Sequence, residues 1–134
     1  MPTILNEYQG NLRSKLVHIK SKSTLLTDAP LDNNGKGESF SPTDTVAGAL
    51  SACMMTIMGI KANDNNIDLI GLHSTVLKIM AENPRRISEI QIKFDWVNCT
   101  ITEKQRIILK RAALTCPVAL SLHPDIKQTI TFNF

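Results

Sequence analysis

Aromatic side chains and cysteines are scarce in this chain of 134 residues, which has one Trp, one Tyr, four Phe and three Cys. Its core must therefore be built from Ile, Leu, Val, Ala and Met. Lys and Arg are scattered and the formal net charge is only +3, so nucleic acid is not expected as a partner. No run of about 18 apolar residues occurs, and we therefore expect no membrane span and no membrane partner.

Signals for export and for metal binding are also missing. Residues 1–7 lack the basic start and apolar stretch of a secretory signal, so a cytoplasmic location is expected. In such a reducing compartment a structural disulfide is not expected, and the disulfides that do form are usually transient and catalytic. No Cys-x-x-Cys or His-x-x-x-His spacing is present, so neither a metal site nor a cofactor is expected.

The order of the predicted elements indicates an α+β fold, in one domain over residues 1–134. The first third is predicted to be strands, and two helices separate the strands that follow. A polar, glycine-containing stretch at 32–37 predicts a loop, and a turn is predicted at 82–86. The predicted strands cover residues 4–8, 12–19, 23–27, 72–80, 87–96 and 126–132.

The first predicted helix has a clear start. Ser41 suits the N-cap, and Pro42 suits the first helical position because its missing N–H is no loss there. Asp44, three residues after the cap, can complete a capping box. The segment that follows is apolar on nearly every side, which predicts a buried central helix that ends near residues 63–66.

Cys53 is predicted to lie about three turns into this first helix. A free cysteine in such a place is often a small hydrophobic core residue. A reactive cysteine needs thiolate character, which a nearby cation or hydrogen-bond donors must supply. The helix start is too distant to do this, so an arginine from elsewhere in the fold would be required.

Cys116 follows the second predicted helix, which begins with a capping box at Thr102 and Gln105. That helix is expected to end near Thr115, because Pro117 disfavours α conformation at Cys116. Its thiol either packs at the helix end or points into a cleft. The third cysteine, Cys99, lies in a predicted turn, and we interpret it as incidental.

Three charged residues are candidates for work beside a thiol. Arg13 lies in a predicted strand, where most arginines are solvated, and it matters chemically only if it reaches a thiolate. Glu38 lies in a polar loop and could pair with an arginine, whereas Asp44 has the capping role. The three histidines form no recognisable triad or metal pattern; they are His18, His73 and His123.

The sequence resembles the OsmC/Ohr family, named for osmotically inducible and organic hydroperoxide resistance proteins. The likeness begins with residues 32–44 and the Ser-Ala-Cys-Met of 51–54. A second block covers 111–118 and 121–124, around Cys116, and a third covers 80–87. The resemblance spans nearly the whole chain, with two cysteine blocks in the family's order.

The resemblance implies two central helices wrapped by antiparallel sheets in an intertwined homodimer, with active sites at the subunit interface. It also implies thiol-dependent reduction of organic hydroperoxides. In that activity Cys53 would be the peroxidatic cysteine and Cys116 the resolving cysteine. Arg13 would stabilise the thiolate and orient the peroxide. An external thiol, in the family often a dihydrolipoyl group, would regenerate the enzyme.

One departure from the family pattern leaves alternatives open. The better-characterised peroxidases carry a Glu shortly after the Pro at the helix start, where it pairs with the arginine. This chain has Thr43 and Asp44 there, so the partner of Arg13 is left open between Glu38, Asp44 and neither, with Glu38 named as the candidate. The alternative function is an OsmC-like small-molecule binding or redox-regulatory protein without efficient peroxidase activity. A third alternative is a structural domain with buried, inert thiols.

Overall fold

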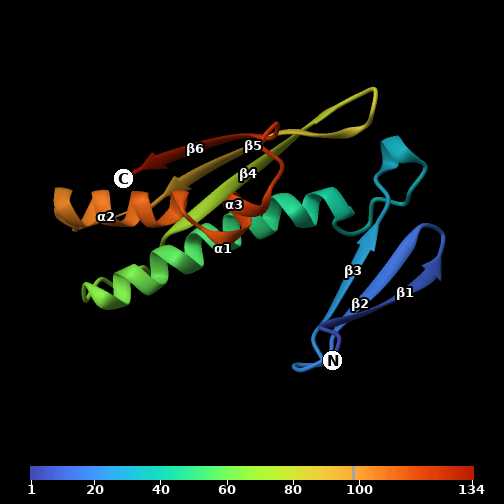
Figure 1. Ribbon diagram of the computed structural model, residues 1–134, viewed down its shortest axis with the longest axis horizontal. Helices are drawn as coiled ribbons and strands as arrows, with labels where there is room; N and C mark the ends of the chain where they lie inside the picture. The colour runs from blue at the N-terminus through green and yellow to red at the C-terminus, as the bar shows by residue number, and fades with distance from the viewer. Residues whose placement is uncertain (98) are drawn as a thin grey trace. The chain divides into compact units, whose positions relative to one another are not determined.

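A three-stranded antiparallel sheet opens the chain in the computed structural model of this protein, which describes residues 1–97 and 99–134. Its strands are β1 (Ile4–Gly10), β2 (Arg13–His18) and β3 (Thr24–Asp28), with β2 in the centre (Figure 1). The three strands predicted in this region are therefore confirmed, with small shifts at their ends. The chain divides into two compact parts, residues 1–46 and 47–134, and the prediction of a single domain stays a prediction.

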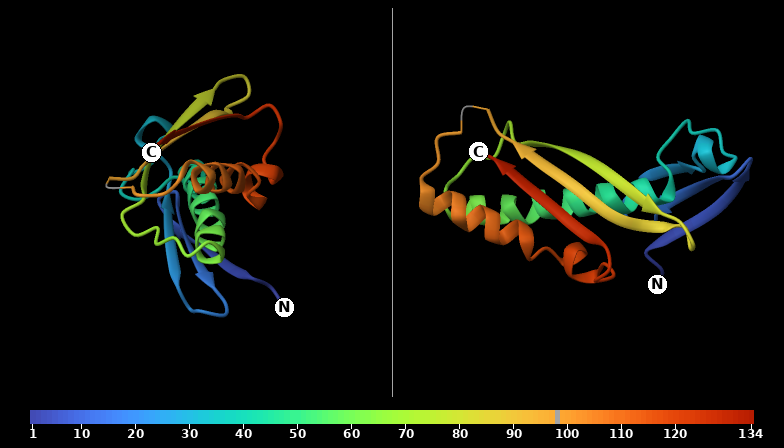
Figure 2. Two further views of the ribbon diagram at one scale, coloured as in Figure 1. Left: turned by 90° about the vertical axis from the view of Figure 1, so that its left-hand side faces the viewer. Right: turned by 90° about the horizontal axis from the view of Figure 1, so that it is seen from above.

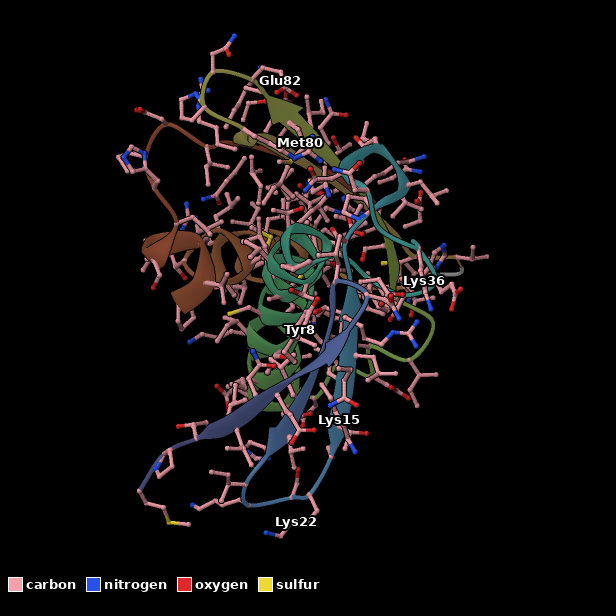
Figure 3. The ribbon with its side chains drawn as sticks, turned by 90° about the vertical axis from the view of Figure 1, so that its right-hand side faces the viewer. Tyr8, Lys15, Lys22, Lys36, Met80 and Glu82 are labelled. Atoms are coloured by element: carbon pink, nitrogen blue, oxygen red, sulfur yellow. The ribbon has the colours of Figure 1, made fainter. Side chains whose placement is uncertain are left out.

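Residues 1–46, all of them described, contain no buried apolar side chain. The buried residues of this part are Thr27, Asp28 and Ser41, which are all polar. On one face of the sheet, Ile4 is 51% exposed and Tyr8, labelled on β1 in Figure 3, is 65% exposed. A small sheet is stable only when an apolar face is covered, so this sheet needs a cover that residues 1–46 do not supply.

The second part, residues 47–134, has a conventional apolar core. A second sheet combines β4 (His73–Ala81), β5 (Arg86–Asp95) and β6 (Lys127–Asn133). The helices α1 (Pro42–Asp64) and α2 (Glu103–Leu114) lie against one face of this sheet (Figures 1 and 2). The large side chains that α1, β5 and α2 bury to 0% exposure between them are Leu50, Met54, Met58, Ile90, Phe94 and Leu109.

The second sheet is mixed, which corrects the prediction of antiparallel sheets. β4 pairs antiparallel with β5, but β6 pairs parallel with β5, from Glu89 opposite Lys127 to Asp95 opposite Asn133. The connection between these two strands contains α2 and the short helix α3 (Pro117–Ser121). A helical crossover brings the chain back to the end of the sheet where it started, so the next strand runs parallel.

The N-terminus of α1 has the predicted capping box. The Ser41 Oγ accepts a hydrogen bond from the Asp44 N–H at 3.0 Å, and the Asp44 carboxylate accepts one from the Ser41 N–H at 2.9 Å. Within the chain, however, α1 is buried along one side only, which differs from a helix buried all round. The opposite side is exposed and carries the small residues Gly48, Ala49 and Ala52.

By length and by a mean hydropathy of 1.4, α1 is the one helix of the described residues that could also cross a membrane. Core helices meet the same two criteria. The buried side of α1 belongs to the core of residues 47–134, so its apolar character has a structural explanation in this fold.

The helix α2 begins as its sequence predicts, and α3 follows directly after Cys116. Thr102 and Gln105 form the predicted capping box at the start of α2. Cys116 has the extended backbone expected before a proline, with φ −66° and ψ 147°, and it is the N-cap of α3. The Gln128 side chain of β6 donates a hydrogen bond to the Ala119 carbonyl at 3.0 Å, which ties α3 to the second sheet.

We predict that Thr102→Ala lowers the free energy of unfolding by about 1 kcal/mol, because the Gln105 N–H loses its side-chain acceptor. Urea denaturation at fixed protein concentration measures this change. The control is Lys104→Ala in the same helical turn, which should stay within about 0.5 kcal/mol of the parent. Equal effects of the two substitutions would show that the cap is not stabilising.

Candidate functional site

Cys53 and Cys116 lie side by side in the part of the chain formed by residues 47–134. Cys53 is half-buried on α1, and Cys116, between α2 and α3, has 0% of its surface exposed. Cys116 belongs to the core cluster and Cys53 packs against that cluster, and both thiols are free. The fold thus brings two cysteines from distant parts of the sequence into one neighbourhood at the core cluster.

Local sequence explains how each thiol reaches this place. On α1, Leu50 and Met54 point into the core against the second sheet, and Cys53, one residue before Met54, lies at the edge of that buried side. At the end of α2, Pro117 stops the helix and turns the chain, which places Cys116 at a corner between two helices. One cysteine is therefore positioned by helix periodicity and the other by a proline turn.

The environment of Cys116 favours the neutral thiol. Burial raises its pKa above the ordinary value of 9.0, and the neighbouring Cys53 thiol acts in the same direction. The Ala119 N–H donates a hydrogen bond to the Cys116 Sγ at 3.3 Å, and this bond and the Val118 N–H oppose the rise in pKa. The net direction is upward, so Cys116 is protonated at neutral pH and the more accessible Cys53 is the better placed nucleophile.

A cluster of charged groups surrounds Arg13 in residues 1–46. The Arg13 Nε donates to Asp28 Oδ1 at 2.7 Å and its Nη2 donates to Asp28 Oδ2 at 2.9 Å, which makes a bidentate ion pair. The same Nη2 donates to Glu38 Oε2 at 3.1 Å. Asp28 is 1% exposed and Glu38 is 62% exposed. The arginine therefore has one buried partner and one solvent-exposed partner.

Asp28 is the site residue that the sequence reasoning missed. In the pairing of β2 with β3, Arg13 lies directly opposite Asp28, so the two side chains are neighbours on one face of the sheet. The signal was present in the hairpin formed by the predicted strands 12–19 and 23–27, because a tight turn between them brings residues 13 and 28 together. Glu38 is a second partner of Arg13, and Asp44 serves as part of the α1 capping box.

The ion pair fixes the charge states of its members. The Arg13 guanidinium lowers the pKa of Asp28 below its ordinary value of 3.8, and a hydrogen bond from the Glu38 N–H at 3.1 Å acts in the same direction. In turn, Asp28 and Glu38 raise the pKa of Arg13. At neutral pH the Arg13 guanidinium and the Asp28 carboxylate are therefore both charged, and Asp28 also anchors the loop that carries Glu38.

The candidate histidines His18 and His123 bond to residues close to them in the sequence. The His18 ring bonds with the Ser21 hydroxyl at 2.6 Å, and the His123 ring accepts a hydrogen bond from the Asp125 N–H at 3.0 Å. Cys99 is half-buried in the segment before α2. Among the described residues, no three His, Cys, Asp or Glu side chains gather in a way that could hold a metal ion.

We predict that Asp28→Asn destabilises the protein at pH 7 and that the difference from the parent shrinks below about pH 3.8. A carboxylate whose pKa is lowered by folding contributes stability above its unfolded pKa, and this contribution is lost as the pH falls through the folded pKa. Thermal unfolding at pH 7 and at pH 3 measures the difference. Glu38→Gln is the control and should have a smaller effect, since Glu38 is mostly solvated. A gap of the same size at both pH values would refute this account of the ion pair.

Comparison with known proteins finds one matching family model and several similar solved structures. Residues 35–131 match the family model of OsmC-like proteins. None of the curated proteins matches the chain. A solved structure from Psychrobacter arcticus, of a candidate osmotic stress induced and detoxification response protein, is 48% identical with a TM-score of 0.95. That match covers 99% of this chain and 96% of the other.

More distant structures share the fold. An organic hydroperoxide resistance protein OsmC from Legionella pneumophila is 14% identical with a TM-score of 0.75, over 100% of this chain and 98% of that one. A candidate organic hydroperoxide resistance protein from Vibrio cholerae, with captopril bound in one of its active sites, is 13% identical with a TM-score of 0.74, over 99% and 92%. The family match covers most of the sequence, and the chain therefore belongs to the OsmC-like family and has its α+β fold.

Proposed function

We propose that the protein reduces organic hydroperoxides with thiol electrons, with Cys53 as the peroxidatic and Cys116 as the resolving cysteine. The observation that carries this proposal is the asymmetric thiol pair. One thiol is half-buried and the other is fully buried, and both lie in or against the same core cluster. Membership of a family that includes organic hydroperoxide resistance proteins supports the choice of substrate class.

The proposed chemistry has two steps on the protein. The Cys53 thiolate attacks the terminal peroxide oxygen, the O–O bond breaks, and the alcohol leaves with a proton while Cys53 becomes a sulfenic acid. The Cys116 thiol then attacks the Cys53 sulfur, and water leaves as the disulfide forms. An external dithiol, of the dihydrolipoyl type, reduces this disulfide by exchange. The sum converts one hydroperoxide and one dithiol to an alcohol, water and a disulfide.

Arg13 has the electrostatic role in this proposal. A guanidinium near Cys53 would favour its thiolate and attract the peroxide oxygens. Asp28 engages Nε and Nη2 together, which fixes the plane of the guanidinium, and Glu38 adds a second bond. We propose that these two carboxylates replace the Glu that this chain lacks at the start of α1.

We also propose that the protein is a cytoplasmic homodimer. The exposed apolar residues of β1–β3 and the exposed small residues of α1 both need a cover. A second copy of the chain could supply it through a two-fold, self-complementary interface.

A redox-regulatory or small-molecule binding protein is the second candidate. The raised pKa of Cys116 favours it, because a protonated resolving thiol slows repeated turnover. Such a protein would form the Cys53–Cys116 disulfide once with peroxide and would show little steady-state reduction. The turnover assay described next separates the two candidates.

We predict that Cys53→Ser loses hydroperoxide reduction by at least about 100-fold, because sulfur nucleophilicity is lost. Without reductant, peroxide-treated Cys116→Ser should hold Cys53 as a sulfenic acid where the parent holds the Cys53–Cys116 disulfide, because the partner thiol is missing. The turnover assay follows cumene hydroperoxide with excess dithiothreitol, and mass spectrometry of the peroxide-treated proteins distinguishes the sulfenic acid from the disulfide. Cys99→Ser is the control and should retain the parent rate. Unchanged turnover in Cys53→Ser would eliminate the peroxidase proposal.

We predict that the parent protein sediments as a dimer, with twice the 14.8 kDa chain mass. Ala52→Arg on the exposed side of α1 should weaken association by about tenfold or more, because it places a charge in the apolar interface. The control is Thr75→Arg, on the outer face of β4, which should leave the dimer intact. Sedimentation velocity over a range of concentrations measures both, and a monomeric parent at tens of micromolar would disprove the dimer.

A further inference from the structure

We propose that the external dithiol regenerates the protein by attacking the Cys53 sulfur, so that Cys116 is the leaving group. This inference rests on the proposed function of the thiol pair, and it specifies which of the two disulfide sulfurs the reductant meets. It also assigns a role in that step to the backbone at the start of α3.

Access to the two sulfurs is unequal. An attacking thiolate must approach one sulfur of a disulfide in line with the bond that breaks, and the attacked sulfur must be reachable. Cys116 is fully buried in the core cluster with Leu109 and Ala113, whereas Cys53 lies at the edge of that cluster and is partly exposed. A reductant that attacked Cys116 would have to enter the core, so the accessible target is Cys53.

The backbone around Cys116 is arranged to receive negative charge on its sulfur. The Ala119 N–H points at the Cys116 Sγ at 3.3 Å, and the Val118 N–H also acts on this sulfur. Donors that are already in place where charge develops lower the barrier of a charge-forming step. Gln128 is a positioning residue in this scheme, because its amide bonds the Ala119 carbonyl and holds α3 in place.

Burial makes Cys116 a poorer leaving group, because it raises the free-energy cost of forming its thiolate. The Ala119 N–H, which donates to the Cys116 Sγ, offsets part of that cost. Removing the Ala119 N–H should therefore slow regeneration without altering the access of Cys53.

The reductant transfers its two electrons to the protein disulfide in two successive attacks. A thiolate of the reductant bonds to the Cys53 sulfur, the Cys53–Cys116 bond breaks, and its electron pair goes to the Cys116 sulfur. The second thiol of the reductant then attacks its own sulfur in the mixed disulfide and releases Cys53. The two protons of the reductant end on the two protein thiols, and the reductant becomes a cyclic disulfide.

The first test maps the attacked sulfur. Diamide, a chemical oxidant, converts the full-length protein to the Cys53–Cys116 disulfide without any peroxide. A brief reaction with excess 2-mercaptoethanol, acid quenching and peptide mass mapping then locate the mixed disulfide. We expect the adduct on Cys53 in at least tenfold excess over Cys116. An adduct mainly on Cys116 would overturn the proposal, as would the failure of diamide to link the two cysteines.

The second test removes one donor. Ala119→Pro deletes the N–H that bonds the Cys116 sulfur, and Ala119→Gly, the matched control, keeps it. We expect Ala119→Pro to slow reduction of the disulfide by dithiothreitol five- to tenfold and to raise the pKa of Cys116 measured in a Cys53→Ser background. The glycine variant should change neither quantity. Equal reduction rates in the two variants would refute the role of the Ala119 N–H.

These outcomes are separable from failure of the proposed function. A protein that reduces no hydroperoxide, yet gives the mixed disulfide at Cys53 after diamide treatment, would disprove the peroxidase and retain the inference. A protein that reduces hydroperoxide but forms the mixed disulfide at Cys116 would support the peroxidase proposal and disprove the inference. If Ala119→Pro does not fold, the mapping experiment on the parent protein still decides the proposal.

Discussion

The packing of α1 against the sheet β4–β6 is the constraint on which the thiol pair depends. Leu50 and Met54 are completely buried in this contact, and they fix the rotation of the helix about its axis. Neighbouring helical positions differ by about 100° around that axis. A shift of one position would carry Cys53 away from Cys116 or into the core. The asymmetry between an accessible and a buried thiol is thus a consequence of ordinary core packing.

The charged cluster in residues 1–46 depends on a different constraint, the register of β2 with β3. Burying the Asp28 carboxylate removes it from water, and the bidentate bond with Arg13 compensates for this loss. A buried ion pair adds little net stability when the desolvation of both partners is counted. The ion pair instead fixes the orientation of the Arg13 guanidinium. Residues 1–46 have no buried apolar side chains whose packing could hold the arginine in place.

Local signals in the sequence predicted much of the structure, and pairings between distant segments were harder to predict. The capping boxes at Ser41 and Thr102 and the turn at Pro117 were predictable because each depends on residues within one helical turn. The parallel pairing of β6 was not, because it depends on how the chain returns after α2. The likeness to a family, rather than local chemistry, predicted Cys53 and Cys116 as a functional pair. Asp28 was missed because the family pattern places the acidic partner of Arg13 near the first helix, whereas the register of β2 with β3 places Asp28 opposite Arg13.

The raised pKa of Cys116 has two opposed effects in the proposed cycle: it slows attack by the resolving sulfur, because the thiolate is the nucleophile, and it supplies a proton. When the sulfenic acid of Cys53 is resolved, its oxygen must leave as water, which requires one proton. A buried site has little solvent to donate it. Because burial keeps Cys116 protonated, the attacking thiol can itself bring the proton that the leaving oxygen needs. The same burial withholds Cys116 from direct oxidation, since the reactive form of a cysteine is the thiolate. Two chemically identical side chains thus acquire different roles, because one lies at the edge of the core and the other lies inside it.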